Sequence, residues 1–147
     1  MIRDAILEDI PAMVAMGESF FAASGYGDVT EYDPESAAAT FAMLIDSPDG
    51  VVLIADEGRP VGTAAALVYP FFFNTAHRHG QEMFWWVEPE FRGTGTGLMR
   101  ELESRASSLG AKSLSVAALA SLKPDVLAEV YRRAGFRASD SSFVKAI

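Results

Sequence analysis

The sequence contains no cysteine. This absence excludes disulfide bonds, thiolate metal ligands and a cysteine nucleophile, and it is consistent with a reducing compartment. The chain also lacks a signal-peptide pattern at its start and any uninterrupted apolar run of the roughly 20 residues that a membrane-spanning helix needs. The longest apolar stretch, Val61 to Phe73, is broken by Gly62, Thr63 and Pro70. We therefore expect a soluble, cytoplasmic protein that does not bind a membrane.

Basic residues are also scarce. The chain has 12 lysines and arginines against 20 aspartates and glutamates, which gives a net charge of −8. Nucleic-acid binding usually requires a basic face, so this balance argues against a nucleic-acid partner. The negative charge favours solubility and is compatible with a cationic substrate such as an amine.

The length indicates one domain spanning residues 1–147, large enough to bury a core. Apolar periodicity and turn signals predict a mixed α/β domain with the order strand, helix, helix, three strands, helix, strand, helix and strand. We expect helices at about 8–23, 34–46, 98–109 and 124–134. We expect strands at 2–5, 51–55, 61–69, 81–87 and 112–117, and one or two more within 136–145. Residues 70–74 are predicted to be irregular, and 75–80 to form a polar loop.

Alternating glycines occupy the segment from Arg92 to Gly97, between the apolar run Met83 to Val87 and a helical pattern that starts at Leu98. Glycines let the backbone approach a ligand closely. The free N–H groups and the dipole at the start of a helix attract an anion, and Arg92 adds a full positive charge. The pattern therefore predicts a buried strand, a glycine-rich turn and a helix that together bind a phosphate or pyrophosphate.

Two common phosphate-binding motifs do not fit this segment. A P-loop ends in Gly-Lys-Ser/Thr, whereas Leu98 and Met99 follow Gly97 here. A dinucleotide fingerprint requires the spacing G-x-G-x-x-G and an acidic residue about 20 positions later, and neither is present. An ATP-binding or dinucleotide-binding enzyme is therefore disfavoured.

The pattern Arg92-x-x-Gly95-x-Gly97 instead resembles the acyl-CoA-binding motif of the GNAT superfamily of N-acyltransferases. The pattern Tyr131-x-x-x-Gly135-Phe136 is similar to the family's ending of its last helix, and the predicted order of elements is the family's order along the whole chain. The aromatic strand and the end of the chain also resemble compact members carried by bacteriophages. One departure concerns the asparagine that many relatives carry near the start of the last helix, because Pro124 stands near that position.

This resemblance implies the acyl-CoA N-acyltransferase fold, with a central mixed twisted sheet flanked by about four helices. It implies an acetyl-CoA-dependent N-acetyltransferase, in which a primary amine attacks the thioester directly in a ternary complex and no metal is needed. It also implies that the glycine segment grips the pyrophosphate of CoA and that the preceding strand presents the thioester. The residues assigned to cofactor binding are Trp85, Val87, Arg92, Gly93, Thr94, Gly95, Thr96 and Gly97.

Two residues are candidates for the proton transfers that acyl transfer to an amine requires. By the resemblance, Tyr131 faces the CoA sulfur and acts as the general acid; the alternative is an aromatic residue that only packs against the sheet. Glu82 is the candidate general base, because it is the only carboxylate on the predicted strand 81–87 and burial would raise its pKa. The alternative for Glu82 is an exposed position at the start of that strand.

The remaining candidates concern the acceptor and possible partners. His77 and His79 are too few for a metal site, so we expect none. In the family, the loops that carry Tyr26, Tyr32 and the aromatics 71–73 shape the acceptor pocket; exposed aromatics there could instead form a homodimer surface. We expect a small-molecule or peptide amine as the acceptor. The rival hypothesis is a weakly active or inactive acyl-CoA-binding module that acts through a protein partner.

Overall fold

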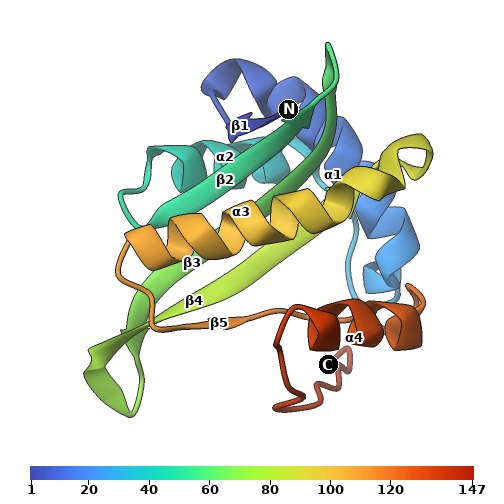
Figure 1. The fold of residues 1–147 in the computed structure, drawn as a ribbon. Coiled ribbons are helices and arrows are strands. Elements are labelled where there is room, and N and C mark those ends of the chain that lie inside the picture. The colour runs from blue at the N-terminus through green and yellow to red at the C-terminus, as the bar shows by residue number, and fades with distance from the viewer.

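The computed structural model describes residues 1–147 and contains one five-stranded sheet with the strand order β1-β2-β3-β4-β5. The first four strands pair antiparallel with their neighbours, and β5 pairs parallel with β4. A parallel pair needs a crossover connection, which α3 supplies across one face of the sheet (Figure 1). The strands are β1 (Ile2–Asp4), β2 (Gly50–Asp56), β3 (Pro60–Phe71), β4 (Asn74–Val87) and β5 (Ser113–Ser115).

Four α-helices flank this sheet, as predicted. They are α1 (Ile10–Ser24), α2 (Pro34–Asp46), α3 (Gly95–Ser108) and α4 (Pro124–Arg133). Figure 1 shows α3 lying across one face, while α1 and α2 cover the opposite face. None of the helices is both long and apolar enough to cross a membrane.

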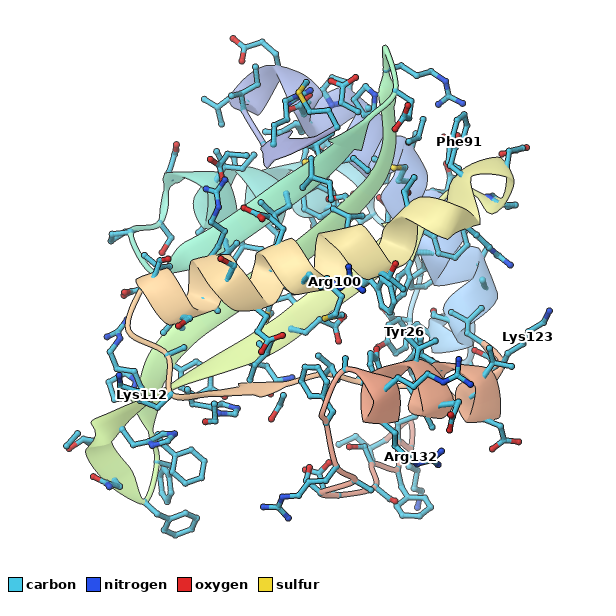
Figure 2. The ribbon with its side chains drawn as sticks, viewed as in Figure 1. Tyr26, Phe91, Arg100, Lys112, Lys123 and Arg132 are labelled. Carbon is cyan, nitrogen blue, oxygen red and sulfur yellow. The ribbon has the colours of Figure 1, made fainter.

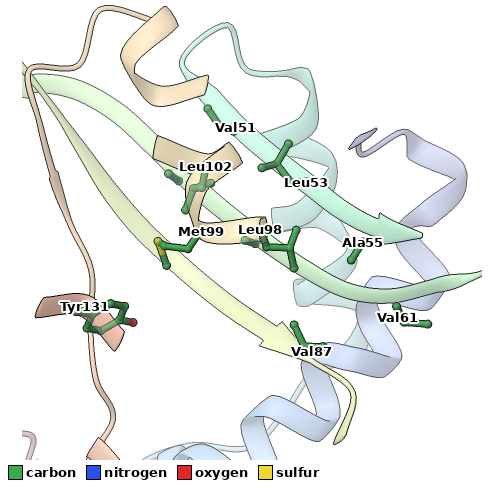
Figure 3. Packing of buried hydrophobic residues seen from close by; sticks show 11 residues of the cluster. Val51, Leu53, Ala55, Val61, Val87, Leu98, Met99, Leu102 and Tyr131 are labelled. Atoms are coloured by element: carbon green, nitrogen blue, oxygen red, sulfur yellow. The ribbon is translucent and has the colours of Figure 1, made fainter. Parts of the chain in front are cut away.

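The central strands are buried on both faces, so they contribute to two separate cores. Successive strand residues point to opposite sides; Leu53 therefore packs with α3, whereas Ile54 packs with α1 and α2. On α3, Leu98 and Leu102 stand one turn apart and are fully buried against the sheet (Figure 3). Burying each such side chain stabilises the fold by about 1.5–3 kcal/mol. The core on the α3 side also includes Tyr131 of α4.

Local signals fixed the helix ends as the sequence predicts. Asp33 caps α2, because its carboxylate accepts hydrogen bonds from the Glu35 backbone N–H and from the Ser36 hydroxyl. Pro34 occupies the first helical position, where the N–H group that proline lacks would have no hydrogen-bond partner within the helix. Gly135 follows α4 with a φ of 92°, a left-handed conformation that glycine adopts without steric cost.

The β3–β4 hairpin is longer than predicted. Residues 74–80 form strand rather than a polar loop, and β3 continues to Phe71. Strand pairing uses backbone groups, so the polar side chains of this segment do not prevent it. The register shifts after Pro70, which has no N–H to donate. The hairpin projects beyond the rest of the sheet (Figure 1), and Phe72 and Phe73 at its tip are about 84% and 85% exposed.

The predicted strands within 136–145 are absent. This segment has no regular structure and is mostly exposed, including Phe143 at 97%. Composition gives the reason: between Arg137 and Ser142 the only apolar residue is Ala138, so a strand here would bury little surface. The predicted strand 112–117 shortens to the three residues of β5, and the sheet ends there.

Candidate active site

Strands β4 and β5 separate part-way along their length. They pair only from His79 with Ser113 to Gln81 with Ser115. Beyond that point β4 runs on to Val87 with β3 alone, while the chain after β5 continues toward α4 (Figure 1). The separation leaves the backbone of β4 from Glu82 onward without a partner on this side. Unpaired N–H and C=O groups at such an opening can bind a ligand.

A β-bulge lies at the mouth of this opening. Ala66 pairs with Glu82 and Ala65 pairs with Phe84, so Met83 is the extra residue. Residues directly opposite each other share a face, which places Glu82 on the α3 side and Phe84 on the α1 side. Met83 lines the same pocket as Phe84. This bulge could not be predicted from the sequence, because Met83 belongs to the uninterrupted apolar run that ends at Val87.

The two predicted catalytic residues meet at one backbone unit, Ala117. Glu82 Oε2 accepts a hydrogen bond of 2.9 Å from the Ala117 N–H. The Tyr131 hydroxyl donates a hydrogen bond of 2.7 Å to the Ala117 carbonyl oxygen. Far apart in sequence, Glu82 and Tyr131 are thus joined through a single residue of the chain that leaves β5.

Burial sets the protonation of this pair. It raises the pKa of Glu82 to about 7, and the hydrogen bond from Ala117 offsets only part of that rise. Burial also raises the pKa of Tyr131, and the nearby Glu82 charge adds to the effect. At neutral pH the carboxyl group is therefore divided between its two forms and can accept a proton, whereas the phenol stays protonated and can donate a hydrogen bond.

Tyr131 also packs as an aromatic residue. Its ring lies 6.1 Å from the Trp85 ring and 5.7 Å from the Phe136 ring, and only 7% of the residue is exposed. Packing against Trp85 and Phe136 holds the Tyr131 ring in place, and this positions its hydroxyl group. The packing interpretation and the catalytic interpretation of this residue are therefore compatible.

The predicted glycine-rich turn is a helix instead. Residues Pro89–Thr94 form a short 3-10 helix that runs directly into α3, and Thr94 and Gly95 both have right-handed helical backbone angles. The prediction of a glycine-rich turn is wrong, because none of these glycines has the positive φ that a turn would use. Helical propensity did not decide the conformation of this segment; its packing did.

Close packing explains two of these glycines. A Cβ at Gly95 would lie 2.9 Å from Trp85 Cζ2, and one at Gly97 would lie 3.0 Å from Ile2 Cδ1. Larger residues would push the start of α3 away from the sheet. A Cβ at Gly93 would meet nothing within 4 Å, so this position faces open space. Of the other predicted residues, Thr94 donates its hydroxyl to the Phe91 carbonyl, whereas Thr96 is exposed and Val87 is buried at the end of β4.

Arg92 is available to an anion. It is exposed and forms no ion pair, and its guanidinium lies 5.9 Å from the centre of the Trp86 ring. The salt bridge that could have engaged it does not form, because Glu88 binds Arg59 at 2.7 Å. Trp85 Nε1 is buried close to the start of α3 and has no hydrogen-bond partner. A free cation and an unpaired donor at one helix start fit a ligand that carries phosphate groups.

Other cations lie nearby on the same side. Figure 2 shows Arg100 on α3, Lys123 immediately before α4 and Arg132 on α4. Arg132 and Arg133 both bind Glu129, so their charges are partly compensated. Arg100 is exposed and has no carboxylate partner. Lys123 has a φ of 45°, a strained backbone for a residue other than glycine.

A pocket of about 190 Å³ lies on the opposite face of the sheet, between β4 and helices α1 and α2. The sequence analysis placed Tyr32 at the acceptor site, and it lines this pocket. Tyr26 packs against Phe20 and Phe21 instead, and the aromatics 71–73 lie at the distant hairpin tip. Most of the wall could not be predicted from the sequence, because its residues resemble ordinary core; they include Met13, Met16, Gly17, Thr63 and Met83.

The two histidines tie β5 to β4. His77 Nε2 and His79 Nδ1 each lie 2.7 Å from the Ser113 hydroxyl oxygen, and Ser115 lies 3.0 Å from the other nitrogen of His79. No cluster of three or more histidine, aspartate or glutamate side chains is placed to hold a metal ion.

A model of the acetyltransferase (GNAT) family matches residues 15–136. The chain belongs to the GNAT acetyltransferase family. This membership agrees with the fold described above and confirms the resemblance drawn from Arg92, Gly95 and Tyr131. No curated protein sequence matches the chain closely enough to count as a relative.

Several solved structures share this GNAT fold. A predicted acetyltransferase with acetyl-CoA from Clostridium acetobutylicum is 21% identical, with a TM-score of 0.75 over 99% of this chain and 94% of that one. An integron cassette protein from the Cole Harbour Salt Marsh metagenome is 22% identical, with a TM-score of 0.78 over 99% and 89%. An aminoglycoside acetyltransferase from an uncultured soil metagenomic sample is 18% identical, with a TM-score of 0.73 over 100% and 97%.

Proposed function

We propose that this protein is an N-acetyltransferase that moves the acetyl group of acetyl-CoA to a primary amine of a small molecule or peptide by direct attack. The observation that carries the proposal is the convergence of Glu82 and Tyr131 on Ala117 at the opening between β4 and β5. One group accepts a proton at neutral pH and the other donates a hydrogen bond. Acyl transfer to an amine requires both functions.

Glu82 removes the proton that an ammonium group carries. A free alkylamine has a pKa near about 10, roughly 3 units above the value of about 7 for Glu82. Transfer across that gap costs about 4 kcal/mol at 1.36 kcal/mol per unit. Moving the amine into apolar surroundings lowers its pKa and narrows the gap. The acceptor pocket and the base therefore act together.

Tyr131 stabilises the departing sulfur. Its raised pKa lies above the value of about 8.5 for a thiol, so complete proton transfer to a thiolate is uphill. A hydrogen bond from the phenol to the developing thiolate costs no such transfer and still favours cleavage of the C–S bond. We therefore assign Tyr131 as the donor to the leaving group, with solvent completing the protonation.

The start of α3 would hold the CoA pyrophosphate. Arg92 would supply charge, and the segment from Gly93 to Gly97 would supply backbone N–H groups. The segment of β4 from Trp85 to Val87 would lie along the rest of the cofactor. When bound, acetyl-CoA supplies the activated acetyl group as a co-substrate.

Thermal unfolding in the presence of acetyl-CoA tests the binding half of the proposal. Saturating acetyl-CoA should raise Tm, because a ligand that binds only the folded state stabilises it. Arg92→Ala should remove most of that rise. A Tm that does not change at millimolar acetyl-CoA would sink the proposal. Release of CoA thiol with a panel of primary amines tests the catalytic half.

One observation favours a second function. Pro124 stands near the position where many GNAT proteins carry a CoA-contacting asparagine, and the preceding Lys123 is strained. A weakly active or inactive acyl-CoA-binding module is therefore the alternative. Binding of acetyl-CoA without thiol release across amines and peptides would support it. The aminoglycoside activity in the name of one structural neighbour fits this chain poorly, because an apolar pocket does not match a polyhydroxylated acceptor.

A further inference from the structure

The pocket between β4 and helices α1 and α2 is built for an aromatic ring. Nine of its eleven lining residues are hydrophobic, among them Met16, Phe20, Phe41 and Phe84. Its volume of about 190 Å³ exceeds the roughly 150 Å³ of an engineered apolar cavity that binds benzene. A side chain or ring of that size would give the lining residues the van der Waals contacts that they lack when the pocket is empty.

A helix glycine keeps the pocket open. Gly17 lies inside α1, where glycine destabilises a helix by about 0.5–1 kcal/mol relative to alanine. A Cβ at Gly17 would lie 2.8 Å from the Tyr32 hydroxyl and 3.5 Å from Phe41 Cζ. The Tyr32 hydroxyl donates a 2.7 Å hydrogen bond to the Val14 carbonyl of α1. The glycine thus allows Tyr32 and Phe41 to form one wall of the pocket.

Two buried polar atoms in this apolar wall have no partner. They are Thr63 Oγ1 and Trp86 Nε1, and only 2% of Thr63 is exposed. Thr63 and Trp86 stand directly opposite each other on β3 and β4, and both residues line the pocket. An unpaired buried polar group is costly. An oxygen on a bound ring would accept from the indole N–H and exchange a hydrogen bond with the hydroxyl.

The charges around the pocket give a bound ligand a direction. Arg92 lies over the Trp86 ring and makes that end positive, which disfavours an ammonium group there. The pocket adjoins a groove of about 490 Å³ that carries Glu31 and shares Tyr32, Phe41, Met83 and Phe84 with it, but not Trp86. An amine attracted by the carboxylate would therefore lie at the Met83 end.

We infer that the acceptor is an aromatic primary amine whose ring carries a hydrogen-bonding oxygen, as in tyramine, with the ring in this pocket and the amine at the Met83 bulge. The inference rests on the proposed function. The amine nitrogen forms a bond to the thioester carbonyl carbon and the C–S bond breaks. The ammonium form of the amine first loses one proton to Glu82, the nitrogen loses a second proton as the amide forms, and that second proton ends on the sulfur, so CoA leaves as the thiol.

Three amines separate this inference from the proposed function. Tyramine carries a ring and an oxygen, phenethylamine has the same ring without the oxygen, and spermidine has amines without a ring. Steady-state CoA release should give kcat/KM in the order tyramine, phenethylamine, spermidine. Loss of one hydrogen bond predicts a tyramine preference of about 3- to 10-fold over phenethylamine. Spermidine turned over more efficiently than both arylamines would overturn the inference and leave the acetyltransferase proposal standing.

Thr63→Val tests the polar end of the pocket. The variant keeps the shape but removes an unpaired hydroxyl, so Tm of the free protein should rise by about 2–8 °C. Its KM for tyramine should rise about 3- to 10-fold, while its KM for phenethylamine stays unchanged. Thr75→Val, the same change at an exposed position of β4, should alter neither quantity. A residue that only fills the core would not discriminate between two amines that differ by one oxygen.

Binding is measured as well, so an inactive protein still gives an answer. Calorimetric titration of the protein–CoA complex with tyramine should show saturable binding that Thr63→Val weakens. Tyramine binding without turnover would support the pocket and remove the catalytic proposal. Equal KM values for both arylamines in Thr63→Val and in the unmodified protein would overturn the assignment of the polar end. The absence of tyramine binding in both assays would overturn the inference as a whole.

Discussion

The two faces of the sheet differ in the chemistry they carry. The α3 side holds the titratable pair, Glu82 and Tyr131, and the start of α3 beside Trp85. The α1 side holds an apolar pocket whose only unpaired polar atoms belong to Thr63 and Trp86. The bulge at Met83 stands between them, because it sends Glu82 to one face and Phe84 to the other.

In the proposed reaction, the two faces of β4 therefore have different functions. Proton transfer and charge binding need polar groups in partly buried positions, whereas recognition of an apolar body needs a dry surface. A regular strand would alternate the two faces residue by residue. The bulge shifts this alternation by one residue at Met83, so Glu82 faces α3 and Phe84 faces α1 although they stand two positions apart. The comparison predicts that variants of the two faces should fail in different ways.

The largest effect is expected for Glu82→Gln. Loss of a general base lowers turnover by about 10²- to 10⁴-fold, while acetyl-CoA should still raise Tm. The glutamine oxygen can still accept from the Ala117 N–H, so the fold should persist. Steady-state thiol release measures the effect, and Glu90→Gln on the exposed first turn before α3 is the matched control. Equal losses in the two variants would remove Glu82 from the mechanism.

Tyr131→Phe should lower kcat by about 10- to 100-fold, since one hydrogen bond to a developing charge is lost. Acetyl-CoA binding should remain, because the phenyl ring keeps its packing against Trp85 and Phe136. The Ala117 carbonyl loses its donor, so the free energy of unfolding should fall by about 1 kcal/mol. Thermal shift and turnover measured on the same sample separate these effects. Unchanged turnover with reduced stability would leave Tyr131 a packing residue alone.

Gly95→Ala should weaken acetyl-CoA binding and destabilise the fold by about 1–3 kcal/mol, because its Cβ overlaps the Trp85 ring. Gly93→Ala is the control, since a Cβ there meets nothing within 4 Å. Urea unfolding with and without acetyl-CoA gives both quantities. If the two alanine variants behaved alike, close packing of α3 on Trp85 would not be the reason for Gly95.

The pH dependence should follow Glu82. Because the folded pKa of about 7 lies above the ordinary 4.5, the carboxylate form is disfavoured in the fold. Stability should fall as the pH rises from about 4.5 to about 7, by no more than about 3 kcal/mol, and Glu82→Gln should lack this fall. Over the same range kcat/KM should rise with pH and level off above about 7, since the base must be ionised. A pH profile of kcat/KM that is flat between about pH 5 and about pH 8 would argue against Glu82 as the base.

Gly17→Ala should give the smallest effect, and it should change binding of the amine and leave binding of acetyl-CoA unchanged. The new Cβ would lie too close to Tyr32 and narrow the pocket. Overpacking of this kind costs roughly 1–3 kcal/mol, so KM for an aromatic amine should rise a few-fold. The acetyl-CoA-induced rise in Tm should stay unchanged, because the change lies on the other face of the sheet. A reduced acetyl-CoA effect in this variant would break the division between the two faces.

The α3 side of the sheet could be predicted from the sequence because its residues belong to motifs. Arg92, Gly95 and Gly97 follow a fixed spacing, and Tyr131 stands four residues before Gly135, so their neighbourhood was foreseeable. Helix caps such as Asp33 are equally local and were predicted correctly. The extended hairpin was not, because residues 74–80 join the sheet through backbone bonds to β3 and their side chains carry no strand pattern.

The sequence by itself determined the family, the order of the elements and the identity of the two titratable groups, because each depends on residue type and local spacing. Only the tertiary structure decided that Glu82 and Tyr131 meet at Ala117, that the glycine segment is helical, and that Thr63 faces Trp86 across a pocket. These facts depend on strand register, on one bulged residue and on what lies across the sheet. Contacts between distant segments leave no pattern in a single chain, and that is why the pocket between β4 and helices α1 and α2 could be seen only in three dimensions.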